Sequence, residues 1–254
     1  MAASEPTGAS AYVRDFNRFE LKYLTTVDEA RRLTAALGEF ATPDPYSGEL
    51  GYAIHSQYWD SPDLRFFWEK LDGQKYRRKL RLRRYATGDT AFVEIKQRID
   101  RTVQKRRVRM TVAEVLALFG KGEIEPNRES EASDPVLKEA LVLCREHRLA
   151  PRVAISYRRH AWFARFEPDL RVTVDTRLQY DTSELDLARP FEQGHWLLPP
   201  ELAVLELKYN QRVPTWLLSL VRQHRLELVR FSKYCAAADL AFYGGRHALA
   251  PKPR

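Results

Sequence analysis

The chain has 254 residues, enough for one large β-rich domain or two small ones, and 44% of them are hydrophobic, which suffices for a packed core. Its 42 Lys and Arg residues exceed the 34 Asp and Glu residues by 42 − 34 = 8 charges. No run of about 18 apolar residues occurs, which excludes a membrane-spanning helix. The basic excess favours a negatively charged partner, and it leaves phosphate, nucleic acid and an anionic membrane open.

The two ends and the cysteines suggest a cytoplasmic protein with one ordered domain. The first residues, MAASEPTGAS, lack the basic start and the apolar stretch of a signal peptide. We therefore expect a disordered tail over residues 1–13, one domain over 14–243 and a loose tail over 244–254. Cys144 and Cys235 show no metal-ligand spacing, and no disulfide is expected between them.

The first half of the chain combines short strands with two helices. Alternation of charged and apolar residues predicts strands over 14–24, 51–60, 75–86, 90–98 and 103–110. A helix over 27–38 has Thr26 as its N-cap and ends at Gly38. A second helix, from Thr111 to Phe119, begins with a capping box made by Thr111 and Glu114.

The second half repeats this organisation after a polar link over 121–134. A helix is predicted over 135–148, and strands over 152–163, 170–178 and 202–209. Pro214 is placed in the first turn of an amphipathic helix that reaches about Glu227. A last helix begins near Ser232 and ends at Gly244.

The position of charge within the strands is the most informative feature. Because side chains alternate between the two faces of a strand, KLRLR at 79–83 has one cationic and one leucine face. The same division recurs in VEIK at 93–96, in LELK at 205–208 and at 105–110. A Glu-x-Lys pair appears three times, at 20/22, 94/96 and 206/208. A solvated face of an antiparallel sheet is the ordinary interpretation, but such faces are rarely so rich in Arg.

Closure of the sheet would bring these charged faces together around one axis. Like charges that are desolvated together need counter-anions, and a polyanion provides them. Arg binds phosphate oxygens with two N–H groups, and a few carboxylates can hold a divalent metal that bridges those oxygens. From alternation alone the sequence predicts an α+β fold with antiparallel strands, each of which has one charged face and one apolar face.

A family resemblance rests on eight segments in a fixed order: RFELKY, KLRLRRY, FVEIK, QKRRV, ISYRRHAWF, LRVTVDT, AVLELKY and RFSKY. In this order they resemble the VTC domain, the polyphosphate-polymerase branch of the triphosphate tunnel metalloenzymes, over residues 14–243. Related tunnel hydrolases of the CYTH type have Glu-x-Glu-x-Lys on the first strand, whereas this chain has Arg18 at the first position. That change favours binding of a longer phosphate chain over hydrolysis with several metal ions.

The resemblance implies an antiparallel closed β-barrel, the triphosphate tunnel, with a charged interior and flanking helices. It also implies the roles of individual residues. Expected to be catalytic are Lys22, Arg81, Arg83, Lys96, Arg159, Arg171 and Lys233. Expected to bind substrate are Lys105, Arg107, Tyr157, Lys208, Arg230, Ser232, Glu20 and Glu94, and Glu206 is expected to hold Mn²⁺ or Mg²⁺. The start of the last helix is also suited to an anion, because its free N–H groups point outward. Asp175 and Asp60 either orient Arg side chains or cap strand ends.

The implied activity is transfer of the terminal phosphoryl group of ATP to a growing inorganic polyphosphate chain. One alternative is a tripolyphosphatase or nucleoside triphosphatase of the same fold. Another is a non-catalytic module that binds polyphosphate or RNA. RNA is disfavoured, because the basic strand faces lack the exposed aromatic residues of a base-stacking surface. A membrane-associated partner, the oligomeric state, the metal and the direction of threading stay open.

Overall fold

The computed structural model describes residues 19–85, 88–100, 102–120, 128–189 and 193–251. Several predictions lie outside these ranges: the N-terminal tail, the start of the first strand with Arg18, residues 121–127 of the polar link and the last three residues. No helix in the described ranges is long and apolar enough to cross a membrane. Both cysteines are buried and free.

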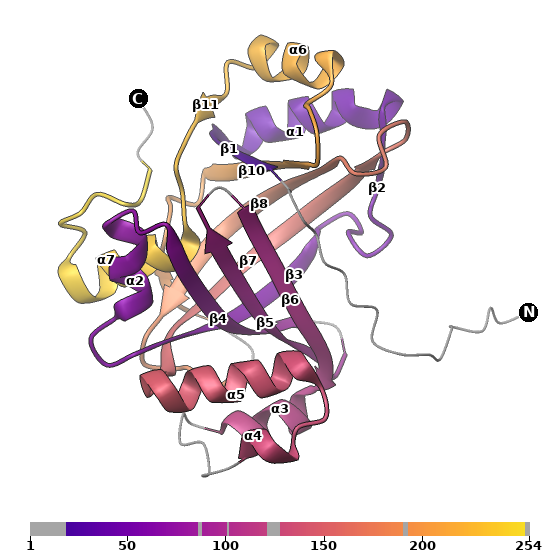
Figure 1. Ribbon diagram of the computed structural model, residues 1–254. Coiled ribbons are helices and arrows are strands. Elements are labelled where there is room, and N and C mark those ends of the chain that lie inside the picture. Colours follow the sequence, from indigo (N-terminus) through magenta and orange to yellow (C-terminus); the bar gives the residue numbers. More distant parts are fainter. Residues whose placement is uncertain (1–18, 86–87, 101, 121–127, 190–192, 252–254) are drawn as a thin grey trace, which may run out of the picture.

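One antiparallel sheet organises the described residues (Figure 1). Its eleven strands are β1 (Phe19–Thr26), β2 (Ala41–Pro43), β3 (Tyr52–Asp60), β4 (Tyr76–Tyr85), β5 (Thr90–Ile99), β6 (Thr102–Thr111), β7 (Ala150–Ala164), β8 (Arg171–Asp181), β9 (His195–Trp196), β10 (Leu202–Tyr209) and β11 (Glu227–Leu228). The strand order is β11-β1-β10-β8-β7-β3-β4-β5-β6, with β2 paired to β7 and β9 paired to β8.

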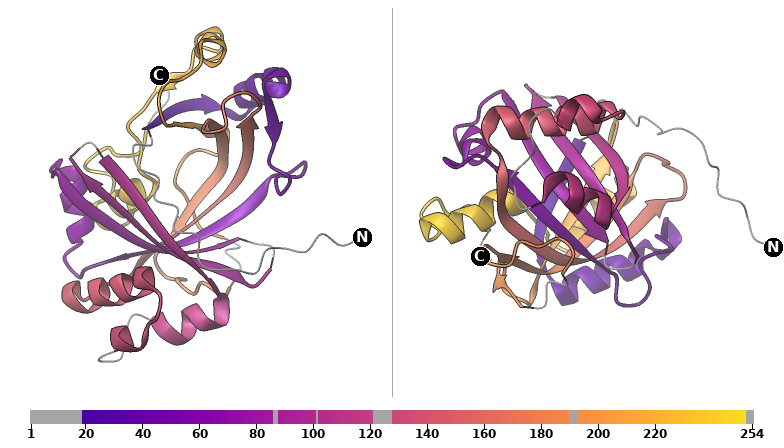
Figure 2. Two further views of the ribbon diagram at one scale, coloured as in Figure 1. Left: turned by 45° about the vertical axis from the view of Figure 1, so that its right-hand side comes forward. Right: turned by 90° about the horizontal axis from the view of Figure 1, so that it is seen from below.

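The described helices flank this sheet. They are α1 (Val27–Ala36), the 3₁₀ helix η1 (Leu37–Glu39), α2 (Arg65–Leu71), α3 (Val112–Phe119), α4 (Arg128–Glu131), α5 (Pro135–His147), α6 (Thr215–Gln223) and α7 (Lys233–Tyr243). The left view of Figure 2 shows the sheet bent into two arms, one with β4, β5 and β6 and the other with β1, β10 and β8. An antiparallel sheet with flanking helices is thus the observed architecture.

The predicted closure of the barrel by backbone pairing is not confirmed. Across the described residues the hydrogen-bonded path has two ends, β6 and the two-residue strand β11. The arms meet through side chains instead, because Lys96 Nζ on β5 lies 3.2 Å from the Glu20 carboxylate on β1. The antiparallel architecture is correct, and backbone closure is the part that the structure does not show.

Apolar residues cover the outer face of both arms. On the first arm, Leu80, Val93 and Ile95 are fully buried against α3 and α5. On the second arm, Leu205 and Leu207 are fully buried against α1 and α6. Each such side chain contributes about 1.5–3 kcal/mol to folding. Because strand side chains alternate, burial of the leucine faces outward turns the cationic faces toward the space between the arms.

The predicted capping residues are confirmed at three helices. Thr26 accepts a hydrogen bond from Glu29 N at 3.1 Å, and Thr111 and Glu114 form the capping box of α3. Ser232 is the N-cap of α7, and Gly244 ends that helix with a left-handed φ of 61°. These local patterns are readable in sequence because each uses neighbouring residues only.

Two boundaries and several short elements differ from the prediction. Pro214 is the N-cap of α6 and precedes its first turn, and the helix ends at Gln223 before reaching Glu227. Arg225 has a left-handed φ of 49°, which stops the helix, and Glu227 then pairs with Leu24 of β1. Helices α2 and α4 and the strands β2 and β9 have no counterpart in the prediction. Asp60 caps α2 by accepting hydrogen bonds from the N–H groups of its first residues.

Candidate functional site

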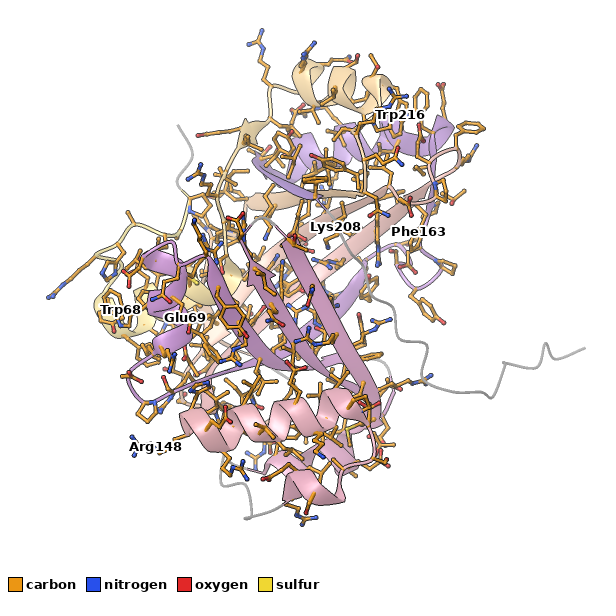
Figure 3. All side chains as sticks on the ribbon, viewed as in Figure 1. Trp68, Glu69, Arg148, Phe163, Lys208 and Trp216 are labelled. Carbon is orange, nitrogen blue, oxygen red and sulfur yellow. The ribbon has the colours of Figure 1, made fainter. Side chains whose placement is uncertain are left out.

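The inner faces of the two arms form the candidate site. Its cations are Lys22, Lys79, Arg81, Arg83, Lys96, Lys105, Arg107, Arg159, Lys208 and Lys233. Its carboxylates are Glu20, Glu94, Asp175 and Glu206. Lys208 is labelled in Figure 3 between the two arms. Among these residues the cations outnumber the carboxylates, which is the defining electrostatic property of the site.

Glu206 on β10 lies at the centre of the first cation cluster. Its side chain is 4% exposed, and lysine Nζ atoms lie 3.4 Å (Lys22), 3.1 Å (Lys208) and 3.0 Å (Lys233) from its carboxylate oxygens. Arg159 Nη2 lies 3.5 Å away. Burial alone would raise the pKa of Glu206, but the surrounding cations together hold it well below its usual range.

Asp175 on β8 holds two of these cations in place. It is fully buried, and it accepts hydrogen bonds from Arg159 Nε at 2.6 Å and Nη2 at 2.7 Å. Its other contact is Lys233 Nζ at 2.5 Å. Of the two roles open for Asp175 in the sequence, the structure shows the orientation of an Arg side chain.

Glu94 on β5 is the centre of the second cluster. Arg81 Nε and Lys105 Nζ each lie 2.5 Å from its carboxylate, and Arg83 Nε lies 3.7 Å away. Burial of Glu94 would raise its pKa, but these three cations hold that pKa well below the usual range. One buried carboxylate therefore neutralises only part of three positive charges.

Tyr157 on β7 lies between the two clusters. Its hydroxyl accepts a hydrogen bond from Arg83 Nη2 at 3.1 Å, and its ring faces Lys233 Nζ at 4.8 Å and the Arg159 guanidinium at 5.3 Å. Cations over an aromatic face are attracted to it electrostatically. The Tyr157 side chain thus joins the Glu94 and Glu206 clusters into one continuous surface.

The lysines of the site differ in their tendency to lose a proton. Burial, outweighing the favourable charge of Glu94, lowers the pKa of Lys105 to about 7, and Arg81 and Arg83 add to this effect. Burial likewise lowers the pKa of Lys208 to about 8. Lys22 behaves in the opposite way, because Glu206 and Glu20 together outweigh burial and raise its pKa. The site therefore contains two lysines that an incoming anion would help to charge.

Three of the predicted site residues, Arg107, Arg171 and Arg230, are not among the cations that form ion pairs with Glu94 or Glu206. Arg171 on β8 is the direct cross-strand partner of Lys208, and its Nη2 donates to Asp44 at 3.0 Å and to the Tyr52 hydroxyl at 3.2 Å. Arg107 is exposed with its guanidinium 4.8 Å from the Phe92 ring. Arg230 is exposed and forms no hydrogen bond or ion pair with another described residue.

Ser232 and three residues outside the predicted set complete the site. Ser232 caps α7 and accepts a hydrogen bond from Lys79 Nζ at 2.7 Å. Tyr58 and Ser56 accept from the guanidinium groups of the first arm, at 3.0 Å from Arg81 and 3.2 Å from Arg83. Lys79 shares the face of Arg81 and Arg83 in the KLRLR segment, so its place was readable from the alternation alone.

The carboxylates fit a hard divalent cation only together with a ligand. Among the described residues, no group of three or more His, Cys, Asp and Glu side chains is arranged to hold a metal ion. Glu20 and Glu206 both lie against Lys22 Nζ, at 3.1 and 3.4 Å, so their oxygens face one region. Mg²⁺ is usually bound by one or two carboxylates together with phosphate oxygens. The donor set thus suits a metal that binds with a phosphate substrate.

Comparison with known proteins decides the family. The model of the VTC domain matches residues 17–242, nearly the whole chain. The chain belongs to the VTC domain family. This VTC domain is 27% identical, over 234 residues, to vacuolar transporter chaperone complex subunit 4 of Schizosaccharomyces pombe. The match covers 75% of the chain and 32% of the relative, so the chain spans about a third of that protein's length.

Solved structures show where this fold also occurs. A protein of Bacillus halodurans named as a candidate adenylate cyclase aligns with a TM-score of 0.50 at 11% identity, over 85% of this chain and 95% of its own. An adenylyl cyclase candidate from Hippeastrum, named for a dominant triphosphatase activity, aligns with a TM-score of 0.50 at 12% identity, over 87% and 94% of the two chains. At these identities the likeness concerns the fold alone.

Proposed function

We propose that this VTC domain is a metal-dependent polyphosphate polymerase that uses ATP. The observation that carries the proposal is the charge of the inner face, where ten cations surround four carboxylates, two of which lie at the centres of the cation clusters. An anion of high charge density would relieve the repulsion among these cations. A chain of linked phosphates supplies such charge along its whole length, and the family resemblance points to the same ligand.

The two arms are proposed to act as the walls of a tunnel. The Lys96–Glu20 contact joins β5 to β1 across the space between the arms. Lys22 Nζ donates to the carbonyl oxygen of Phe231 at 3.0 Å, which ties β1 to the segment before α7. Side-chain and loop contacts of this kind can enclose a ligand where backbone pairing stops.

In the proposed reaction, a terminal oxygen of the polyphosphate chain attacks the γ-phosphorus of ATP. The bond from that phosphorus to the β,γ-bridging oxygen breaks, and ADP leaves with the electron pair. Phosphoryl transfer depends mainly on positioning and on neutralisation of charge. Arg81, Arg83 and Arg159 are suited to bind phosphate oxygens through paired N–H groups. Lys22 and Lys233 are suited to neutralise phosphate charge beside Glu206.

A divalent metal would be held by Glu206, with Glu20 as its neighbour, and by phosphate oxygens. When bound, Mg²⁺ or Mn²⁺ would neutralise charge that develops on those oxygens. The protein's own contribution is to fix the carboxylate. Four cations contact Glu206 and keep it ionised, so it is available as an oxygen ligand at neutral pH.

Hydrolysis of a triphosphate is the second candidate function. The Hippeastrum protein of similar fold is named for a dominant triphosphatase activity. The same cations would hold a triphosphate for attack by water, and orthophosphate would be the product. Binding of polyphosphate without catalysis is the remaining alternative, and it requires no metal.

Incubation of the purified protein with ATP and Mn²⁺ or Mg²⁺ separates these possibilities. A polymerase yields ADP and polyphosphate in step, a hydrolase yields orthophosphate, and a binding module yields neither. Glu206→Gln should abolish the reaction, whereas Glu139→Gln provides a matched control on the outer face, where Glu139 pairs with Arg106. Equal activity of Glu206→Gln and the wild type would contradict the proposed role of Glu206.

A further inference from the structure

The cationic face of β4 and β5 continues beyond both carboxylate centres. Arg77 and Lys79 precede Arg81 on the inner face of β4, and Arg98 follows Lys96 on the inner face of β5. Arg77 and Arg98 are direct cross-strand partners. Lys70 on α2, which packs beside the start of β4 (Figure 1), joins them. Lys70, Arg77, Lys79 and Arg98 are called the outer cation group below.

These four cations are not neutralised by the described part of the protein. None of them lies within ion-pair distance of a described carboxylate. Arg77 and Arg98 donate to the backbone oxygens of Gln74 and Asp100, and Lys79 donates to Ser232. Glu69 on α2, labelled in Figure 3, is already engaged by Arg65 and by the N–H of Arg78.

The arrangement places like charges against each other. Lys79 faces Lys96, and Lys96 in turn faces Lys105, in addition to the Arg77–Arg98 pair. Like charges directly opposite on neighbouring strands destabilise a sheet. Burial, followed by the positive charges of Arg77, Lys79 and Arg98, lowers the pKa of Lys70. The three other cations therefore lie close enough to Lys70 to repel its ammonium group. An anion bound beside these cations would relieve the repulsion.

We propose that the outer cation group binds the part of a polyphosphate chain that lies beyond the two carboxylate centres. The proposal rests on the proposed function only in that the inner face binds linked phosphates; it does not require catalysis. From Arg83 to Arg77 the strand is extended over six residues, which is roughly 20 Å at about 3.3 Å per residue. Three linked phosphates are too short to reach both ends. A triphosphate held at Arg81 and Arg83 would not extend to Arg77 and Arg98, so these two residues would contact long chains only.

The triple variant Lys70→Gln/Arg77→Gln/Arg98→Gln tests this site, with Lys79 kept because it contacts the α7 cap. The matched control, Lys138→Gln/Arg212→Gln/Arg222→Gln, removes the same charges at exposed positions away from the inner face. Calorimetric titration measures binding of long-chain polyphosphate and of tripolyphosphate at several salt concentrations. Thermal unfolding checks the fold, and relief of repulsion should leave the melting temperature of the triple variant at or above that of the wild type.

We expect the triple variant to bind long-chain polyphosphate roughly tenfold more weakly, with a smaller salt dependence, and to bind tripolyphosphate like the wild type. The control should bind both ligands like the wild type. Equal affinity of the triple variant and the wild type for long chains would overturn the proposal, as would an equal loss for both ligands. If the wild type binds long chains but makes no polyphosphate, the polymerase proposal fails while the outer cation group is still supported.

Discussion

Replacement of Asp175 by Asn tests how the charge of the site is balanced. The substitution keeps the shape of the side chain and removes its negative charge. Arg159 and Lys233 then keep Glu206 as their remaining carboxylate, at 3.5 and 3.0 Å. Because Asp175 is fully buried and in contact with both cations, its loss leaves positive charge without compensation inside the protein.

The expected loss is about 3–5 kcal/mol in the free energy of unfolding, the usual cost of removing one partner of a buried ion pair. Tripolyphosphate should recover part of it, because phosphate oxygens can replace the missing carboxylate. A ligand that binds only the folded state stabilises it in proportion to the logarithm of its concentration over Kd. The gain from saturating tripolyphosphate should therefore be larger in Asp175→Asn than in the wild type.

Urea unfolding with and without tripolyphosphate measures both effects. Asp28→Asn is the matched control, because Asp28 forms an exposed i,i+3 pair with Arg31 and should change stability by less than about 0.5 kcal/mol. Asp175 acts as a positioning residue through Arg159 and Lys233, so its loss should lower kcat more than it raises KM. Unfolding of Asp175→Asn at the urea concentration of the wild type would refute this reasoning.

Four further results are expected. Triphosphate binding, followed by calorimetry, should weaken by up to about tenfold per pH unit as Lys105 (pKa about 7) and Lys208 (pKa about 8) lose their protons, and Lys105→Arg should flatten this decline. The free energy of unfolding of the ligand-free protein should rise from about pH 7 to about pH 10, because Lys105 and Lys208 bind protons in the unfolded chain but lose them in the folded protein. A fall in this free energy between pH 7 and 9 would contradict the lowered pKa values of the two lysines. Chelation of divalent metal should abolish phosphoryl transfer in product assays but leave calorimetric binding of long-chain polyphosphate largely intact. Thr111→Ala should lower the free energy of unfolding by about 1 kcal/mol through loss of the α3 capping box, with no change in phosphate affinity.

Local patterns allowed much of the fold to be predicted. The KLRLR, VEIK and LELK segments each place cations on one face and apolar residues on the other, and these faces became the site and the core. The caps of α1, α3 and α7 follow from residues three positions apart. Such signals survive in the sequence because the chemistry that produces them is local.

Contacts between distant segments could not be predicted. The pairing of Arg171 with Asp44 joins residues 127 positions apart, and no pattern in the sequence indicates it. The end of α6 depends on a left-handed residue and on the pairing of Glu227 with β1, neither of which has a periodic signal. Closure of the barrel was implied by the family resemblance alone, because alternation reports only which face a side chain takes. It cannot show whether the end strands of the sheet pair.

The fate of the γ-phosphoryl group of ATP distinguishes chain synthesis from hydrolysis most directly. Purified protein is incubated with ATP labelled at the γ-phosphate and with Mn²⁺, and the label is followed into long-chain polyphosphate and into orthophosphate. We expect the label to accumulate in the chain in step with ADP, and Glu206→Gln to stop this transfer while Glu139→Gln does not. Recovery of the label in orthophosphate alone would show that the inner face serves hydrolysis, and absence of any transfer would show that it only binds phosphate chains.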